Sequence, residues 1–151
     1  MENFKELRKA VEKITVAGEI DNFLQYKTAY NRLLDTAKEI PDSIAINYMG
    51  NKITYKQFLN IIDIAAKGFA ELGIGYNDVV TMSALPTPYG IASFYALDKL
   101  GAVYHMVNSL TNVNEIKREL SNFNSEYFVG NDLFCSAEKQ AIYRSAGVKK
   151  L

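Results

Sequence analysis

The central part of the sequence decides the fold, and from Asp78 to Val107 it reads DVVTMSALPTPYGIASFYALDKLGAVYHMV. The apolar, β-branched residues from Asp78 to Leu85 predict a buried strand. A helix is expected from Pro88 to Leu100, because Thr87 can cap its first turn and proline is favoured at the first helical position. Ala102 to Val107 predicts a second strand. A strand, a helix and a strand in this order are typical of a right-handed crossover between parallel strands.

The same alternation continues toward the end of the sequence. It predicts a helix from Thr111 to Asn122, a strand from Glu126 to Val129 and a helix from Asp132 to Ala146, after which Val148 should open another strand. The predicted class is therefore α/β, with a parallel β-sheet flanked by helices in three layers. Because a strand that opens at Val148 needs neighbours to pair with, the topology also suggests that the sequence is a truncated piece.

Two amphipathic patterns precede this unit, from Asn3 to Ile14 and from Phe23 to Glu39, and Pro41 ends the second. We expect a helical lead-in over residues 1–40. The α/β unit is expected over residues 41–151, incomplete at its C-terminus.

A hairpin is predicted between the lead-in and the sheet. Ser43 to Met49 and Lys52 to Thr54 can form its strands, with Gly50-Asn51 as a two-residue turn. Thr54 to Gln57 matches a capping box, with an apolar residue on each side of it to staple the helix start. The helix that follows is amphipathic. Its buried stripe should consist of Phe58, Ile62, Ala65, Phe69 and Leu72. Its exposed stripe should consist of Lys56, Asn60, Asp63, Lys67 and Glu71.

Composition excludes several classes of protein. The 151 residues are 48% hydrophobic, and 17 basic residues balance 17 acidic ones without any basic run, so no nucleic-acid surface is expected. Neither a secretory signal nor an apolar run long enough to cross a bilayer appears. The single cysteine, Cys135, cannot form an internal disulfide, which predicts a reducing, cytoplasmic environment.

No motif in the sequence predicts a catalytic or metal site. Gly73-Ile74-Gly75 closes a predicted helix, whereas a phosphate-binding glycine motif follows a strand and opens a helix. His105 is the only histidine and has no ligand partner nearby in sequence, so a packed histidine is favoured over a zinc ligand or a general base. Cys135 lies near a predicted helix start between apolar neighbours, and burial is favoured there over a reactive thiol.

The predicted central helix carries Asp98 and Lys99, the only charged residues between Val79 and Asn114. Adjacent helical residues do not face each other, and a lysine near a helix C-terminus is favoured by the helix dipole. The Leu-Pro-Thr-Pro loop follows a strand at its carboxyl end, where parallel sheets place ligands. It offers the hydroxyls of Ser83 and Thr87 but no ionisable group, so it marks a location for a site without its chemistry.

Taken in order, several stretches resemble the N-terminal region of adenylate-forming acyl-CoA synthetases and related AMP-forming ligases. They are the hairpin with Ile53-Thr54-Tyr55-Lys56-Gln57-Phe58, the helix end and strand Leu72-Gly73-Ile74-Gly75-Tyr76-Asn77-Asp78-Val79-Val80, Leu85-Pro86, Lys99-Leu100-Gly101-Ala102, and VNSLTNVNEIKREL. The resemblance extends from Pro41 to Leu151. One departure is Ser109, where many members of the family have proline.

The resemblance implies a two-step reaction: a carboxylate attacks ATP to give an acyl-adenylate, and a thiol, usually of coenzyme A, then takes the acyl group, with Mg²⁺ assisting. In that family the phosphate loop, the adenine and ribose motifs and the catalytic lysine lie beyond the region that this sequence matches. No residue here is therefore assigned as catalytic, cofactor-binding or metal-binding, and no cofactor is expected in this chain. ATP, Mg²⁺ and coenzyme A would belong to the parent enzyme.

Three interpretations remain open. The chain could be the N-terminal piece of an acyl-CoA synthetase of fatty acid metabolism, inactive alone, with the remainder of the enzyme as its partner. It could instead be a stand-alone α/β module that binds a ligand or a partner without catalysis. The parent could also be a related adenylating enzyme, such as a peptide-synthetase adenylation domain or a luciferase-like ligase. A cut chain would expose apolar surface and a sheet edge, which predicts self-association.

Overall fold

The computed structural model describes residues 28–130 and 136–150. In chain order the elements are α3 (Ala29–Glu39), β1 (Ile44–Tyr48), β2 (Asn51–Thr54), α4 (Tyr55–Glu71), β3 (Val79–Ser83), α5 (Pro88–Leu100), β4 (Val103–Met106), α6 (Val113–Asn122), β5 (Tyr127–Gly130) and α7 (Ala137–Ser145). The helix predicted from Asn3 to Ile14 lies outside the described residues. In the described part of the chain, no helix has both the length and the apolar composition that a membrane span requires.

β3 is the central strand of the main sheet, which has the order β4-β3-β5. Both of its pairings are parallel, with Thr81 opposite His105 on one side and Phe128 on the other. Beyond β5, the chain near its end forms a parallel bridge between Tyr127 and Lys150. The predicted parallel sheet is confirmed, and the strand expected from Val148 is present in the described residues as this single bridge.

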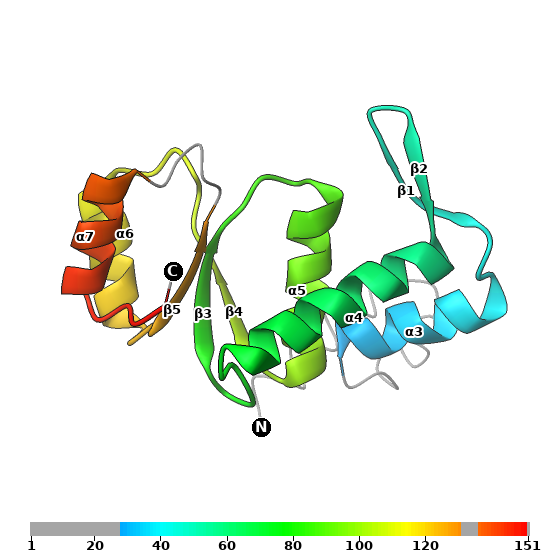
Figure 1. The fold of residues 1–151 in the computed structure, drawn as a ribbon, viewed down its shortest axis with the longest axis horizontal. Helices are drawn as coiled ribbons and strands as arrows, with labels where there is room; N and C mark the ends of the chain where they lie inside the picture. The colour runs from blue at the N-terminus through cyan, green and yellow to red at the C-terminus, as the bar shows by residue number, and fades with distance from the viewer. Residues whose placement is uncertain (1–27, 131–135, 151) are drawn as a thin grey trace, which may run out of the picture.

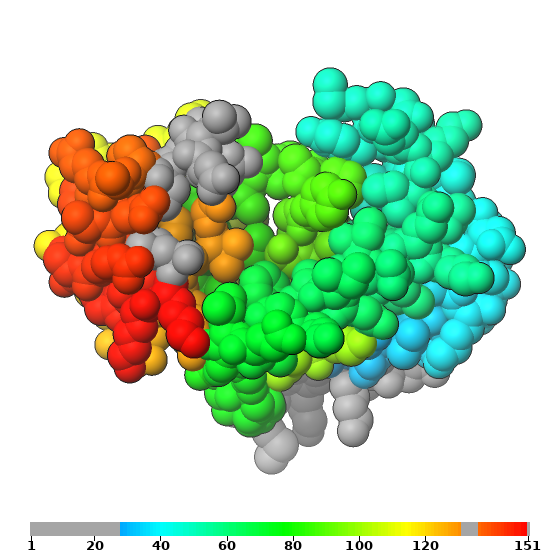
Figure 2. All heavy atoms as spheres, in the orientation of Figure 1, coloured from blue at the N-terminus to red at the C-terminus, as the bar shows by residue number. Residues whose placement is uncertain are grey.

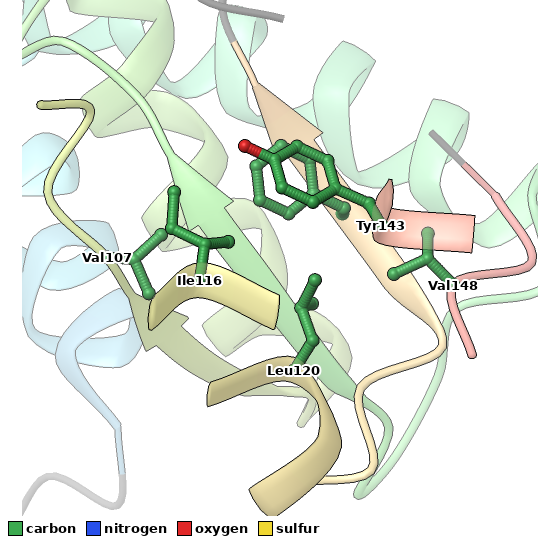
Figure 3. Close-up of a cluster of buried hydrophobic side chains, with 6 residues drawn as sticks. Val107, Ile116, Leu120, Tyr143 and Val148 are labelled. Carbon is green, nitrogen blue, oxygen red and sulfur yellow. The ribbon is translucent and has the colours of Figure 1, made fainter. Parts of the chain in front are cut away.

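Helices cover both faces of the sheet, so the predicted three layers are confirmed (Figure 1). α5 lies between the sheet and α4, and α6 and α7 pack on the opposite face. Figure 3 shows the core on the α6 and α7 side, where Val148 lies beside the ring of Tyr143. The buried members of this cluster are Val107, Ile116, Leu120, Phe128, Tyr143 and Val148.

Glycines with positive φ end three of the helices. Gly73 has a φ of 89°, Gly101 of 72° and Gly147 of 106°. After each glycine the next amide donates to a carbonyl of the helix that has just ended, for example Ile74 N–H to the Phe69 carbonyl at 3.0 Å. This is the Schellman arrangement, in which the left-handed residue turns the chain away from the helix axis. Each turn sends the chain back toward the sheet.

The N-terminal boundary of α3 differs from the prediction. Thr28 has extended backbone angles, and its hydroxyl accepts a hydrogen bond from the Asn31 amide at 3.1 Å. A threonine in this conformation is an N-cap. α3 therefore begins at Ala29, and the first part of the predicted helix, residues 23–27, lies outside the described residues.

The capping box at the start of α4 is confirmed. The Gln57 amide donates to the Thr54 hydroxyl at 3.2 Å, and the Thr54 amide donates to the Gln57 side chain at 2.9 Å. The staple residues Ile53 and Phe58 lie in one hydrophobic cluster. The predicted polar stripe of α4 is exposed, but Leu72 of the apolar stripe is 46% exposed because it lies at the C-cap, past the last turn that faces α5.

The hairpin turn lies one residue earlier than predicted. Tyr48 pairs with Asn51, so the two turn residues are Met49 and Gly50, with φ values of 52° and 88°. Two residues with positive φ define a type I′ turn, which matches the twist of the strands that it joins. The sequence pattern indicated Gly50-Asn51 because methionine is seldom found at such a position. In Figure 1 the hairpin stands out from the rest of the described chain at the N-terminal end of α4.

Replacing Met49 by asparagine should stabilise the protein. A side chain with a Cβ at positive φ costs about 1–2 kcal/mol, and asparagine tolerates this conformation better than methionine does. Met49 is 87% exposed, so its side chain contributes little packing. We expect Met49→Asn to raise the free energy of unfolding by about 0.5–1 kcal/mol in urea denaturation. Met49→Leu is the control and should leave the stability unchanged; an equal gain in both variants would contradict the explanation.

Candidate functional site

A cavity lies at the carboxyl ends of β3 and β4, between the sheet and α5. Its volume is about 660 Å³, which is within the range of ligand pockets. Figure 2 shows the molecular surface hollowed between the strands and α5. The lining residues are Ala84, Leu85, Pro86, Gly90, Ile91, Phe94, Tyr104, Met106, Val107, Asn108, Ser109 and Leu110. This is the edge at which parallel sheets place ligands, as the Leu-Pro-Thr-Pro loop predicted.

The loop after β3 is held by short-range hydrogen bonds. The Thr87 amide donates to the Leu85 carbonyl at 2.7 Å, and the Thr87 hydroxyl accepts from the Gly90 amide at 3.2 Å. Thr87 is therefore the N-cap of α5, with Pro88 as its first helical residue, as predicted. The Ser83 hydroxyl donates to the Ser109 hydroxyl at 3.2 Å and ties this loop to the one after β4. Both hydroxyls that the sequence offered to a ligand hold the scaffold instead.

The loop after β4 is an Asx-type turn. The Asn108 side chain accepts a hydrogen bond from the Leu110 amide at 2.9 Å, and the Asn108 carbonyl accepts from Thr111 at 2.9 Å. Asn112 then caps α6 by accepting from the Asn114 amide at 2.8 Å. Because side-chain amides satisfy the backbone here, the loop keeps a defined shape at the mouth of the cavity.

The walls of the cavity carry no lysine, arginine, aspartate or glutamate among the described residues. Its aromatic wall consists of Phe94 and Tyr104, whose rings meet edge to face at 5.2 Å between centroids. Burial raises the pKa of the Tyr104 phenol, which keeps that group neutral at physiological pH. The cavity thus suits an uncharged apolar group, and offers no counter-charge to a phosphate or a carboxylate.

His105 is packed beneath the sheet on the face opposite to this cavity. Its Nδ1 lies 3.0 Å from the Thr81 hydroxyl, its ring stacks on Phe123 at 4.2 Å, and its Nε2 lies 3.9 Å from a Glu119 oxygen. This order of groups looks like a nucleophile, a base and an acid. Thr81 is fully buried in the central strand, however, so its hydroxyl has no access to a substrate. The packed position favoured from the sequence is where the structure places His105.

Asp98 and Lys99 connect α5 to two other helices. Asp98 accepts a hydrogen bond from the Tyr30 amide of α3 at 2.7 Å, and Lys99 binds Asp63 of α4 at 2.7 Å and lies 5.0 Å above the Tyr30 ring. The hydrogen bond to Asp63 raises the pKa of Lys99, while partial burial opposes that rise. From the sequence, the helix dipole alone accounts for Lys99 at this position, and the contacts with α3 and α4 were missed. The feature that could have indicated them is the presence of two charged residues in an otherwise apolar stretch.

The last sequence candidates are the Gly73-Ile74-Gly75 stretch and Cys135. Gly73 is the left-handed residue that ends α4, as predicted, and its carbonyl accepts a hydrogen bond from the Tyr127 hydroxyl at 3.3 Å. The Leu72 carbonyl at the same helix end accepts from the Lys150 ammonium. Cys135 lies outside the described residues. Within residues 28–130 and 136–150, no group of three or more histidine, cysteine, aspartate or glutamate side chains could hold a metal ion.

Comparison with known proteins identifies the family. A profile of the AMP-binding enzyme family matches residues 33–150, which is most of the chain. The chain belongs to that family. The family resemblance seen in the sequence is thereby confirmed, and the match covers most of α3 and the hairpin as well as the α/β unit.

Solved structures of this family share the fold. The N-terminal domain of FACL13 from Mycobacterium tuberculosis has a TM-score of 0.74 at 22% identity, over 83% of this chain and 33% of that one. The O-succinylbenzoate coenzyme A synthetase MenE from Bacillus subtilis, in complex with AMP, has a TM-score of 0.73 at 16% identity, over 83% of this chain and 31% of that one. Apo MatB from Rhodopseudomonas palustris has a TM-score of 0.71 at 20% identity, over 80% of this chain and 24% of that one. The chain therefore spans a quarter to a third of the length of these structures.

Gly90 at the mouth of the cavity should not tolerate a side chain. A Cβ placed there would collide with the carbonyl oxygen of Leu85, a backbone atom of the tight loop. Gly68 in α4 is the matched control, because it is also helical and a Cβ placed there would have nothing within 4 Å. We expect Gly90→Ala to lower the free energy of unfolding by about 1–3 kcal/mol and Gly68→Ala to raise it by about 0.5–1 kcal/mol. Chemical denaturation of both variants tests this, and a stabilised Gly90→Ala protein would show that the loop is not rigid.

Proposed function

We propose that the chain is the N-terminal part of an acid–thiol ligase that activates a carboxylic acid with ATP and transfers it to coenzyme A. In the first step a carboxylate oxygen attacks the α-phosphorus of ATP, which forms the acyl-adenylate and releases pyrophosphate. In the second step the thiol attacks the acyl carbon, which forms the thioester and releases AMP. The match of residues 33–150 to the AMP-binding enzyme family carries the proposal.

The chain's own residues would contribute scaffold to this enzyme. The cavity at the carboxyl ends of β3 and β4 has no charged wall among the described residues. The phosphates of ATP, and the Mg²⁺ that accompanies them, would therefore be held by residues from elsewhere in the parent. The loops after β3 and β4 are instead held in shape by their own hydroxyl and amide groups. We accordingly propose that this chain holds no cofactor and is inactive when isolated.

An exchange assay tests the inactivity of the isolated chain. The chain is incubated with ATP, Mg²⁺, labelled pyrophosphate and a panel of fatty and aromatic carboxylic acids, and a complete AMP-binding synthetase serves as the positive control. We expect no incorporation of label into ATP above the blank. Acid-dependent exchange would show that the chain adenylates by itself, which would overturn the scaffold assignment while supporting adenylate chemistry.

The coding DNA tests the assignment to a ligase separately. We expect the reading frame to continue beyond the Leu151 codon into a Ser/Thr/Gly-rich loop that ends in Pro-Lys-Gly. A stop codon directly after Leu151 would exclude that parent enzyme.

The cavity supports a second candidate function, which is a binding module without catalysis. Its uncharged aromatic wall of Phe94 and Tyr104 suits a neutral ring. Benzamide and benzoate form a matched pair of probes, since they share a phenyl ring and a planar substituent of the same size and differ chiefly in charge. On this alternative, benzamide should raise the melting temperature of the chain and benzoate should not. A melting temperature unchanged by millimolar benzamide would remove the alternative.

We further propose two partners and a location. The first partner is the remainder of the parent enzyme. The second is another copy of this chain, because without the remainder of the enzyme the exposed apolar surface would drive self-association. The single cysteine, which cannot form an internal disulfide, supports a cytoplasmic location. A role in fatty acid metabolism is proposed from the resemblance to acyl-CoA synthetases alone. Cell fractionation with an antibody to the chain tests the location.

A further inference from the structure

We infer that the outer edge of β4 is the surface through which two copies of this chain associate, by antiparallel pairing of β4 with β4. This names the surface for the self-association proposed above and does not depend on the enzymatic assignment. The inference rests on the free backbone groups of β4, the absence of any charge in its sequence that would protect the edge, and the apolar side chains on either side of it.

The hydrogen bonds of β4 show which of its backbone groups are free. Val103 and Val107 donate their amides toward β3, to the carbonyls of Asp78 and Met82, at 2.8 and 2.9 Å. Backbone amides of a strand alternate in direction, so those of Tyr104 and Met106 point away from β3. β4 is the last strand of the sheet order on this side, and no described residue bonds to these two amides.

The sequence around β4 has none of the usual protections of an edge strand. Natural edges carry lysine, proline or a bulge that discourages pairing with another chain. From Gly101 to Asn114 the chain has no aspartate, glutamate, lysine, arginine or proline. Val103 is 45% exposed and Met106 is 68% exposed, so the edge is accessible and apolar. The formal net charge of zero adds no long-range repulsion between copies.

A two-fold axis through His105 makes the edge self-complementary. In antiparallel register, Tyr104 of one copy lies opposite Met106 of the other, and each pair exchanges its outward N–H and C=O groups. Tyr104 and Met106 are on the same face of β4, because both line the cavity. The pairing therefore places a tyrosine ring against a methionine side chain twice, and it joins the two apolar cavities across the axis.

A second copy fits this edge better than a small ligand does. A neutral molecule in the cavity would contact the apolar walls but leave the edge amides to water. An extended strand satisfies both the amides and the apolar face, which is the mode of recognition called β-augmentation. β4 of another copy is such a strand, with outward backbone groups at the matching spacing and an apolar face beside them.

Sedimentation velocity of the full chain tests the inference. At about 100 µM we expect a species of twice the 17.0 kDa chain mass that dissociates on dilution, as mass action requires. Met106→Lys places a charge on the edge and should raise the dissociation constant by at least ~10-fold. Ile64→Lys is the matched control, because Ile64 is 65% exposed on α4, away from the edge. It should leave the dissociation constant unchanged.

Hydrogen exchange provides a readout that does not depend on a variant. The amides of Tyr104 and Met106 should exchange more slowly at high than at low protein concentration, while those of the exposed hairpin turn should not change. A monomer at every concentration, an equal loss of association in Met106→Lys and Ile64→Lys, or exchange at β4 independent of concentration would each overturn the inference. None of these outcomes bears on the proposed ligase function, which the coding DNA tests.

Discussion

The rest of the structure depends on the burial of α5 between the sheet and α4. Ala92, Ala96 and Leu97 of this helix have no exposed surface. Leu97 packs toward β3, whereas the two alanines face α4. Small side chains on that side let the two helices approach closely, and a leucine on the other side fills the space above the sheet. Full burial of one such leucine contributes about 1.5–3 kcal/mol, so α5 holds both neighbours in place.

Polar contacts at the two ends of α5 then orient what surrounds it. At its N-terminus, Thr87 caps the first turn and fixes the loop that borders the cavity. At its C-terminus, Asp98 and Lys99 bind groups on α3 and α4, while Gly101 turns the chain into β4. α5 therefore sets the positions of α3, β4 and the cavity mouth together. These contacts explain why Asp98 and Lys99, the only charged residues of the central stretch, lie at the C-terminal end of α5.

The candidate site shows what a scaffold can supply without catalytic groups. Its position, at the carboxyl ends of β3 and β4, follows from the parallel topology. Its chemistry does not, because Ser83 and Thr87 are both used in hydrogen bonds within the protein and no charged side chain of the described residues lines the walls. In an AMP-binding enzyme such a unit would define space and leave the ionic chemistry to other parts of the chain. Beside the cavity, the outer edge of β4 has no partner strand among the described residues.

The sequence by itself determined the class of fold, the bounds of α5, the capping box at Thr54 and the glycine that ends α4. These features depend on contacts within a few residues, so local patterns identify them. Only the tertiary structure decided the order β4-β3-β5, the Lys99–Asp63 contact and the packing of His105 on Phe123, which join residues distant in sequence. It also placed the hairpin turn at Met49-Gly50, because strand register rather than residue preference selects the turn residues. The tertiary structure also decided that β4 is an edge strand among the described residues, since a strand can be identified as an edge only when its neighbours in the sheet are known.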